Sequence, residues 1–526
     1  MKRVKKILHI GNIANNAYLN AKILNSETNI ESDVLLLDYY HIMGCPEWED
    51  ADFMGDYGDD NSPDWSDVNL SGFKRPSWFV QGHREYALKY LLAKNEGKLF
   101  KSKLYKYLLK KSSESRKKNK ATNSIFTNYY YLFSALKFVL FVMCNKDFCD
   151  FKKYFKEFSK IKLFILFVFL LPLTPILVLC RIYAKNIKHE YFIEFENRIS
   201  ELYESFKEIQ PARACYFDKS YFTLYQKEII LWKKLLSYYD MVIGYGLDGI
   251  YPLLCGKKYI AFEHGTIRNL PFQNTTLGVI TAITYIYANH VIITNADNLL
   301  AANKLKLEKY TFVPHPINED PLIKIANKYE NLHSKYDTDF IIFHPSRQHW
   351  EKDVRHPDWE KGNDIFIDGF AKFVKEINKS AKAILISWGH KTEDSKLLIE
   401  LLGIQDNIIW LKPKSTYEMT RTILGCDLLA DQFYLGAFGS TAPRAWLCSK
   451  PSMLYLNENM HEWCFNEMPM NIQASTPKEV FDGLRDVYSD VMSNKKEFND
   501  LSKKWYERYH SNDVIREKLL KIIDSV

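Results

Sequence analysis

Acidic, basic and imidazole side chains gather in one short turn, residues 262–272, with the sequence FEHGTIRNLPF. Glu263, His264 and Arg268 follow a predicted β-strand, and Gly265 permits a tight bend after it. Histidine changes its charge near neutral pH, so His264 and Glu263 are candidates for general acid–base chemistry on a hydroxyl group. A lone histidine is more often structural, but the adjacent acid at a predicted strand end favours catalysis here. Arg268 is a candidate for binding a phosphate of the acceptor.

A second stretch, residues 436–451, has the small residues that are typical of phosphate-binding loops. It reads GAFGSTAPRAWLCSKP, and Gly439, Ser440 and Thr441 precede a helix that we expect to begin near Pro443. Small residues allow backbone N–H groups to approach a phosphate at a helix N-terminus, where the helix dipole favours negative charge. A glycine–serine turn also occurs in ordinary loops, so the interpretation needs basic residues at other strand ends.

Two such basic residues are present. Arg347 follows a predicted strand in the segment HPSRQHW, and Lys361 opens the next predicted helix. A diphosphate leaving group needs charge neutralisation while its bond breaks, and Arg and Lys held in a cleft supply it. The alternative is that both residues are ordinary surface charges.

These residues require elements that place them together. Short β-rich runs alternate with helical patterns on both sides of residues 312–321, which is the signature of parallel sheets. Ligands of such sheets bind beyond the carboxyl ends of the strands. Asn15 and Asn16 follow the first predicted strand, residues 5–11, and are therefore candidates for contacting an acceptor.

We expect an α/β protein with two Rossmann-like domains facing a cleft. The expected division is an N-terminal acceptor domain (1–311, with an insert at 98–188), a linker (312–336), a C-terminal donor domain (337–505) and a C-terminal helix (506–526) that packs back on the first domain.

The second half resembles the donor domain of family-4-type glycosyltransferases of the GT-B fold, over roughly residues 337–505. The motifs that carry the resemblance are, in order, HPSR, KGND, GCDLLADQF and GAFGSTAPRAWLCSKP. The resemblance implies that Arg347 and Lys361 bind the pyrophosphate of a UDP- or GDP-linked sugar, with no metal or other cofactor. It also implies that a histidine or an acid of the first half, His264 or Glu263, acts on the sugar or the acceptor.

The sequence departs from the family pattern at two glutamates, where it has Gly436 and Arg444. The second glutamate of the family accepts hydrogen bonds from the nucleotide ribose, and an arginine accepts none. Arg444 either binds a phosphate or turns away, and Asp431 at a nearby strand end is a candidate for the missing carboxylate.

The insert at residues 98–188 carries 20 Lys and Arg but only four Asp and Glu, a net charge of +16 in a chain whose total is +7. It also contains an uncharged run at residues 163–180, which Pro172 and Pro175 interrupt. A basic and apolar segment fits an anionic membrane surface, and basic residues on both flanks predict a monotopic contact on the cytoplasmic face. The alternatives are a buried core segment, a solvated charge run or an RNA-binding arm; the adjoining apolar and aromatic residues favour lipid over nucleic acid.

The remaining composition narrows the setting. Nine cysteines without a CxxC pair indicate reduced thiols, and no metal-ligand set is visible. Residues 45–67 hold nine acids and two tryptophans without the ligand order of a calcium loop. We expect a solvated loop near the acceptor entrance there, with Trp48 or Trp65 stacking on sugar.

These observations together predict a glycosyltransferase that moves a sugar from a nucleotide-sugar donor to a lipid-linked or glycolipid acceptor. The expected setting is the cytoplasmic face of the inner membrane, in the biosynthesis of a bacterial surface polysaccharide such as lipopolysaccharide or capsule. Two alternatives remain: a GT-B nucleotide-sugar epimerase, and a membrane-tethered sugar-binding protein with a degenerate donor site.

Overall fold

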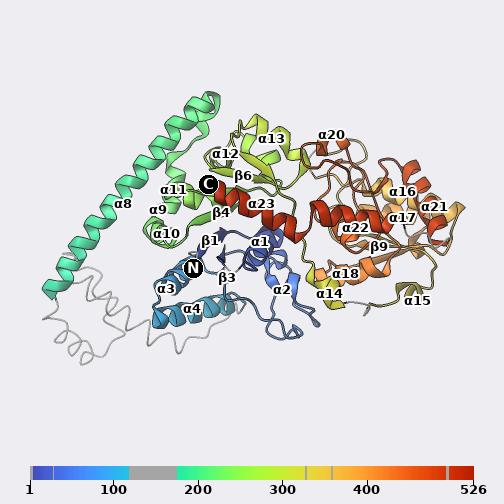
Figure 1. Ribbon diagram of the computed structural model, residues 1–526, viewed down its shortest axis with the longest axis horizontal. Helices are drawn as coiled ribbons and strands as arrows, with labels where there is room; N and C mark the ends of the chain where they lie inside the picture. Colours follow the sequence, from blue (N-terminus) through green and yellow to red (C-terminus); the bar gives the residue numbers. More distant parts are fainter. Residues whose placement is uncertain (1–3, 28, 118–173, 326–328, 357–358, 493–496) are drawn as a thin grey trace. The chain divides into compact units, whose positions relative to one another are not determined.

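The computed structural model describes residues 4–27, 29–117, 174–325, 329–356, 359–492 and 497–526 (Figure 1). The chain divides into two compact units, one formed by residues 1–109 and 199–526 and the other by residues 110–198. The larger unit contains two parallel sheets, and each is described below with the helices that cover it.

The first sheet has seven parallel strands in the order β3-β2-β1-β4-β5-β6-β7. Its strands are short apolar and β-branched runs, and most of their residues are buried. The strand order reverses between β1 and β4, as in dinucleotide-binding Rossmann sheets. The strands are β1 (Lys5–Ile10), β2 (Ile30–Leu37), β3 (Phe79–Gly82), β4 (Met241–Tyr245), β5 (Ile260–Phe262), β6 (His290–Ile293) and β7 (Tyr310–Phe312). The main helices of this half are α1 (Asn16–Leu24), α2 (Pro46–Asp50), α3 (Arg84–Asn95), α10 (Ile229–Leu236), α11 (Ile250–Leu254), α12 (Thr276–Ile286) and α13 (Leu299–Lys304).

The second sheet has six parallel strands in the order β10-β9-β8-β11-β12-β13, which is the same Rossmann-like arrangement. The structure thus confirms the predicted α/β class with two Rossmann-like sheets. The strands are β8 (Ile341–His344), β9 (Lys382–Ile386), β10 (Ile408–Leu411), β11 (Leu428–Ala430), β12 (Ser452–Leu454) and β13 (Ile472–Gln473). The helices of this half are α14 (Asp320–Ile325), α15 (Leu332–Tyr336), α16 (Asn363–Glu376), α17 (Thr392–Leu402), α18 (Thr416–Gly425), α19 (Ala442–Leu447), α20 (Glu458–His461) and α21 (Pro477–Met492).

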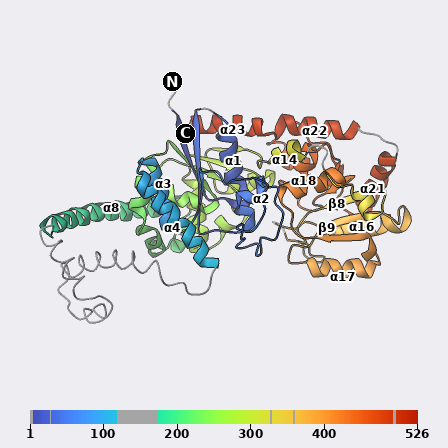
Figure 2. The same cartoon turned by 90° about the horizontal axis from the view of Figure 1, so that it is seen from below.

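The end of the chain returns to the first sheet. Helix α22 (Glu497–Tyr509) packs against α19, and α23 (Asn512–Ser525) packs against α1 (Figure 2). Ile515, Leu519, Ile522 and Ile523 of α23 belong to the same buried cluster as the apolar residues of β1, β2 and β4. The last helix therefore completes the core of the first half.

The acid-rich segment 45–67 differs from the solvated loop that we expected. Trp48 is only 5% exposed and packs against Phe53 and Tyr57 at centroid distances of 6.1 and 6.0 Å. Glu47 accepts two hydrogen bonds from Arg75, at 2.9 and 2.7 Å. Residues 45–49 are thus buried rather than solvated, and Trp48 is not available for sugar, whereas Asp56, Asp59 and Asp67 are exposed as expected. The stacking of Trp65 on sugar stays a prediction.

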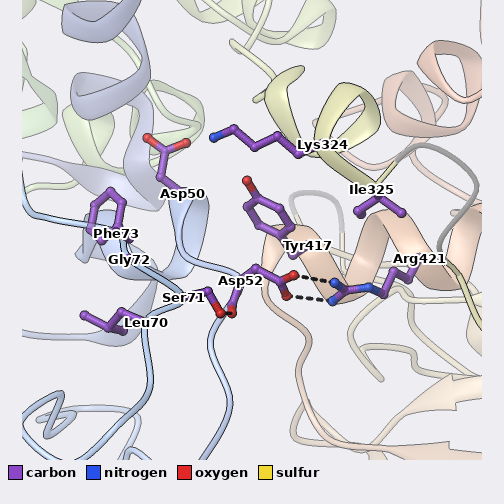
Figure 3. A pocket seen from close by; sticks show the side chains of 10 residues that line it. All are labelled: Asp50, Asp52, Leu70, Ser71, Gly72, Phe73, Lys324, Ile325, Tyr417 and Arg421. Carbon is purple, nitrogen blue, oxygen red and sulfur yellow. Dashed lines mark hydrogen bonds and ion pairs between the residues drawn. The ribbon is translucent and has the colours of Figure 1, made fainter.

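The same segment joins the first half to the second. Glu49 accepts a hydrogen bond of 2.6 Å from Thr416, and Asp52 forms a bidentate pair with Arg421, both on α18. Figure 3 shows this ion pair at one wall of an open pocket of about 490 Å³, between residues 50–73 and helices α14 and α18. The charges of Asp52 and Arg421 neutralise each other. Through this ion pair and the Glu49–Thr416 hydrogen bond, the segment connects the two halves.

Most of the predicted membrane segment lies outside the described residues, which exclude 118–173. Of the flanking elements, α4 (Leu99–Lys117) carries the first part of the basic run, and α8 (Thr174–Ile209) begins inside the apolar stretch. Pro175 occupies the first turn of α8, where a missing N–H is tolerated. No helix among the described residues combines the length and apolarity needed to cross a membrane.

Candidate active site

Arg347 and Lys361 lie at the carboxyl edge of the second sheet. Arg347 follows β8, and its guanidinium packs 5.3 Å from the ring centroid of Trp388. Lys361 precedes α16, and its Nζ donates a hydrogen bond of 2.6 Å to Oε1 of Gln432. Within the described residues neither side chain forms an ion pair. Two cations thus lie close to each other without a carboxylate bound to either.

The surroundings of Lys361 lower its pKa to about 8. Burial is the largest cause; the positive charges of Arg347 and Arg268 act in the same direction, while Asp431 and Asp297 oppose them. Burial also lowers the pKa of Arg347. Arg268 and Asp297 belong to the first half, so charged groups of both halves act on the pKa of Lys361.

Asp431 is the carboxylate at the end of β11. It is buried, and its Oδ1 accepts a hydrogen bond of 2.7 Å from Ser346. Burial raises its pKa, whereas the charge of Lys361 and hydrogen bonds from Ser346 and the backbone of Ala442 lower it. The carboxylate therefore holds the start of α19 close to Lys361; whether it replaces the family's ribose-binding glutamate stays a prediction.

The loop before α19 leaves room beside its small residues. A Cβ added to Gly439 would meet no atom within 4 Å, and Ser440 is exposed while Thr441 is half-buried. This open space fits the predicted phosphate-binding role of the loop.

The side chain of Arg444 points toward helix α18. Its Nη1 donates to Oγ1 of Thr416 at 3.5 Å, and Thr416 is itself bound to Glu49 of the first half. Of the two options that the sequence leaves for this residue, the observed contact matches the one in which the side chain turns away.

Glu263 and His264 follow β5 in the first half. Glu263 is completely buried, and Thr294 contacts both its backbone carbonyl and its Oε2, at 3.1 and 3.5 Å. Gly265 has φ 90°, and a Cβ there would lie 2.7 Å from a guanidinium nitrogen of Arg268. Arg268 forms a bidentate ion pair with Asp297. The bend thus brings the three predicted residues together, but Arg268 already has a carboxylate partner.

His315 was missed by sequence reasoning and belongs to this cluster. Its ring lies 6.3 Å from that of His264, centroid to centroid and nearly parallel. Nδ1 of His315 lies 3.0 Å from Oδ1 of Asn16, and Nε2 lies 3.3 Å from Oδ1 of Asn295. Both ring nitrogens of His315 therefore face amide oxygens, and burial together with the charge of Arg268 lowers its pKa to about 4.

Asn16 therefore contacts His315 and helps to position its ring. Asn15 is completely buried, and its amide bonds to Asn12 at 2.8 Å and to the carbonyl of Cys45 at 3.0 Å. These contacts use the donor and acceptor of Asn15 inside the protein, and the acceptor-binding role predicted for both asparagines stays a prediction.

The pKa shifts define what this cluster is able to do. Burial, joined by the nearby His315, lowers the pKa of His264 well below its usual value, so the imidazole is neutral at pH 7. Burial raises the pKa of Glu263 to about 7, against the smaller effect of Arg268. A neutral imidazole is able to accept a proton, and a carboxyl that titrates near 7 exists in both forms at neutral pH.

Among the residues that the structure describes, no three His, Cys, Asp or Glu side chains are grouped as metal ligands would be. The candidate site thus contains three cations, the histidines His264 and His315, and buried carboxyl groups.

No protein-family model matches the chain, and no curated protein matches it. Among solved structures, the chain is similar to the Anabaena protein HepE in complex with UDP and glucose, with 14% identity and a TM-score of 0.45, over 59% of this chain and 84% of HepE. It is also similar to a Staphylococcus aureus TarM variant in complex with fondaparinux, a GlcNAc-glycerol and UDP, with 16% identity and a TM-score of 0.40, over 56% of this chain and 58% of TarM. A third similar structure is that of S. aureus MnaA with UDP, with 11% identity and a TM-score of 0.41, over 98% of this chain and 95% of MnaA.

The raised pKa of Glu263 predicts a pH-dependent stability. An acid whose pKa is higher in the folded protein than in the unfolded chain destabilises the fold progressively as pH rises from about 4.5 to about 7. Glu263→Gln removes this penalty, so its free energy of unfolding should exceed that of the parent by a few kcal/mol at pH 8 and match it near pH 4.5. Urea unfolding at both pH values measures the difference. The exposed Glu308→Gln is the control, and equal stabilities of parent and Glu263→Gln at pH 8 would contradict the burial argument.

Proposed function

We propose that the protein is a glycosyltransferase of the GT-B type that transfers a sugar from a nucleotide-sugar donor to a hydroxyl group of an acceptor. The observation that carries the proposal is the pair of cations Arg347 and Lys361 at the carboxyl edge of the second sheet, neither of which has a carboxylate partner within the described residues. Burying such charges is unfavourable unless an anion accompanies them. A nucleoside diphosphate supplies that anion, and the open space at Gly439 lies on the adjoining loop.

The same charges serve the reaction. When the bond between the sugar and the diphosphate breaks, negative charge grows on the leaving oxygen, and Arg347 and Lys361 are placed to stabilise it. Ser440 and Thr441 complete the donor side, with Asp431 as the candidate for the nucleotide ribose. Arg444 is committed to Thr416, so we assign it no contact with the donor.

The acceptor side is the cluster after β5. His264, neutral at pH 7, is the candidate that takes the proton of the attacking hydroxyl. Glu263, buried next to it in the sequence, keeps a candidate role in proton transfer, and the charge of Arg268 also acts on Lys361 of the second half. No metal or redox cofactor enters the proposal.

The nature of the acceptor follows from the insert. A segment with a net charge of +16 beside apolar residues favours contact with an anionic leaflet, which suits an enzyme whose acceptor is a lipid-linked glycan or glycolipid. We therefore place the protein at the cytoplasmic face of the inner membrane, in the synthesis of a bacterial surface polysaccharide.

The decisive experiment is incubation with radiolabelled UDP- and GDP-sugars and a membrane extract. Label in the lipid fraction supports transfer, conversion of the free nucleotide sugar indicates an epimerase, and binding without either indicates a sugar-binding protein.

Arg347→Ala and Lys361→Ala should each weaken the binding of UDP or GDP by roughly 10- to 150-fold, because a charge-assisted contact to a buried phosphate contributes about 1.5–3 kcal/mol. Calorimetric titration of the nucleotide measures the affinity. Lys375→Ala, an exposed lysine on α16, is the matched control. Unchanged nucleotide affinity in both variants would contradict a donor site at the carboxyl edge of the second sheet.

Nucleotide binding should also depend on pH through Lys361, whose pKa is about 8. A bound diphosphate favours the charged amine, so binding should take up protons near pH 8, and affinity should fall as pH rises further. Titrations in buffers with different ionisation enthalpies count these protons. Lys361→Ala should lose the effect; the same proton uptake in parent and variant would assign it to another group.

His264→Ala should lower turnover by about 10²–10⁴-fold with little change in donor affinity, because the imidazole is assigned to proton transfer. Turnover and nucleotide binding are measured on the same preparations, beside Glu263→Gln. His290→Ala is the control, since His290 begins β6 at the opposite edge of the sheet and bonds to Thr311 at 3.0 Å. Transfer at the parent rate by His264→Ala would make this turn structural.

The chain should bind vesicles that contain phosphatidylglycerol more tightly than pure phosphatidylcholine vesicles, and added salt should weaken this binding. Replacing the exposed Lys101, Lys103 and Lys106 of α4 by Gln should weaken it roughly 100-fold, since each lysine near an anionic surface contributes about 1 kcal/mol. Vesicle flotation gives the bound fraction. The matched control replaces Lys372, Lys375 and Lys379; an equal loss there would indicate only an effect of net charge.

A further inference from the structure

The ring of His315 lies between two hydrogen-bond acceptors that a neutral imidazole cannot satisfy together. Its Nδ1 lies 3.0 Å from Oδ1 of Asn16, at the start of α1, and its Nε2 lies 3.3 Å from Oδ1 of Asn295, which follows β6. A neutral imidazole carries one N–H, whereas the imidazolium ion carries two. The arrangement around the ring therefore matches the charged form of His315.

Further contacts fix the orientation of both amides. The amide nitrogen of Asn16 donates to the carbonyl of Ile13 at 3.1 Å, and that of Asn295 donates to Oγ1 of Thr294, also at 3.1 Å. Exchanging nitrogen and oxygen in either amide would give up these bonds. Each ring nitrogen thus faces an oxygen, and neutral His315 donates to only one of the two while a lone pair meets the other.

The charged and titratable groups around the ring keep it neutral at pH 7. Burial and the positive charge of Arg268 lower the pKa of His315 to about 4. Arg268 is itself bound to Asp297 in a bidentate ion pair. Two other titratable side chains lie near the ring: His264, at 6.3 Å between centroids, and His510, whose Nε2 donates to the carbonyl oxygen of His315 at 2.9 Å. Burial lowers the pKa of both of these histidines, so neither adds a positive charge at pH 7.

An anion bound near Arg268 would reverse this balance. The charge of Arg268 acts on Lys361 as well as on His315, so the proposed diphosphate site and the His315 ring are influenced by the same cation. A nearby negative charge favours the charged form of an imidazole. The imidazolium form donates to Asn16 and Asn295 together, which ties the loops after β1, β6 and β7 to one another.

We infer that His315 is a ligand-linked proton site, which takes one proton from solvent when a diphosphate compensates the charge of Arg268 and then clamps the three strand-end loops together. The inference rests on the proposed function for the identity of the anion. His315 needs no contact with the ligand, so it is a positioning residue. Because the complex binds the proton more tightly, the gain in nucleotide affinity is complete below about pH 4 and is lost as pH rises through the higher pKa of the complex.

The test follows the imidazole by NMR on the full chain, with ¹³C at Cε1 of the histidines, and His315→Gln identifies its signal. Saturating UDP or GDP should raise the pKa of His315 from about 4 to above about 5. Asn295→Ala should reduce this rise, because the imidazolium then loses one acceptor. The nucleotide affinity of the parent relative to His315→Gln should increase roughly threefold or more between pH 8 and pH 4.5. This ratio cancels the titration of the nucleotide itself.

Arg268→Gln tests the dependence on charge without any nucleotide. The variant removes the cation and leaves the carboxylate of Asp297 uncompensated, so the pKa of His315 should rise as it does with a diphosphate. Lys309→Gln removes an exposed charge just before β7 and is the matched control, which should leave the pKa of His315 unchanged. Thermal unfolding shows that each variant is folded.

A pKa of His315 that stays the same in folded Arg268→Gln would overturn the inference. Calorimetry with UDP and GDP separates it from the proposed function. If a nucleotide binds and the pKa of His315 stays at about 4, the donor function stands and the proton site fails. If neither nucleotide binds while Arg268→Gln raises the pKa, the proton site stands and the proposed donor function fails.

Discussion

Two cations at the edge of the second sheet, Arg347 and Lys361, lack a carboxylate partner within the described residues, and the rest of the site is arranged around this uncompensated charge. Desolvating an ammonium or guanidinium group is unfavourable, and a cation–π contact to Trp388 and a neutral hydrogen bond to Gln432 offset only part of the penalty. Asp431 lies near enough to attract Lys361, but Ser346 and the start of α19 already bind it. The protein thus keeps a local excess of positive charge that an anionic ligand would balance.

The sequence allowed the two sheets and several strand-end residues to be predicted, because apolar β-branched runs that end in polar turns are typical of buried parallel strands. Very short strands are not predictable in this way. Because β7 has only three residues, the segment after it was expected to be a linker, and His315 was not recognised as part of the site. Three acids of residues 45–67, Glu47, Glu49 and Asp52, have partners that the composition did not predict. Their partners, Arg75, Thr416 and Arg421, lie 28 to 369 residues further along the chain, and composition alone reveals no such pairing.

Arg444 illustrates how a departure from a family pattern acquires a physical meaning. At the position where the resemblance to family-4-type glycosyltransferases would place a glutamate, the guanidinium of Arg444 instead reaches Thr416, which binds Glu49 of the first half. The substitution thus adds a link to the contact between the two halves. In the proposed function, recognition of a donor ribose therefore falls to other groups, and Asp431 is the candidate.

The return of α23 to the first sheet has a consequence for synthesis on the ribosome. β7 ends at Phe312 and α23 begins at Asn512, so 199 residues are translated between the last strand of the first sheet and the helix that covers it. At about 5–20 residues per second this interval lasts roughly 10–40 s. Throughout it, the apolar surface that Ile515, Leu519, Ile522 and Ile523 later cover remains open on the nascent chain. The first half therefore cannot complete its core until α23 has been synthesised.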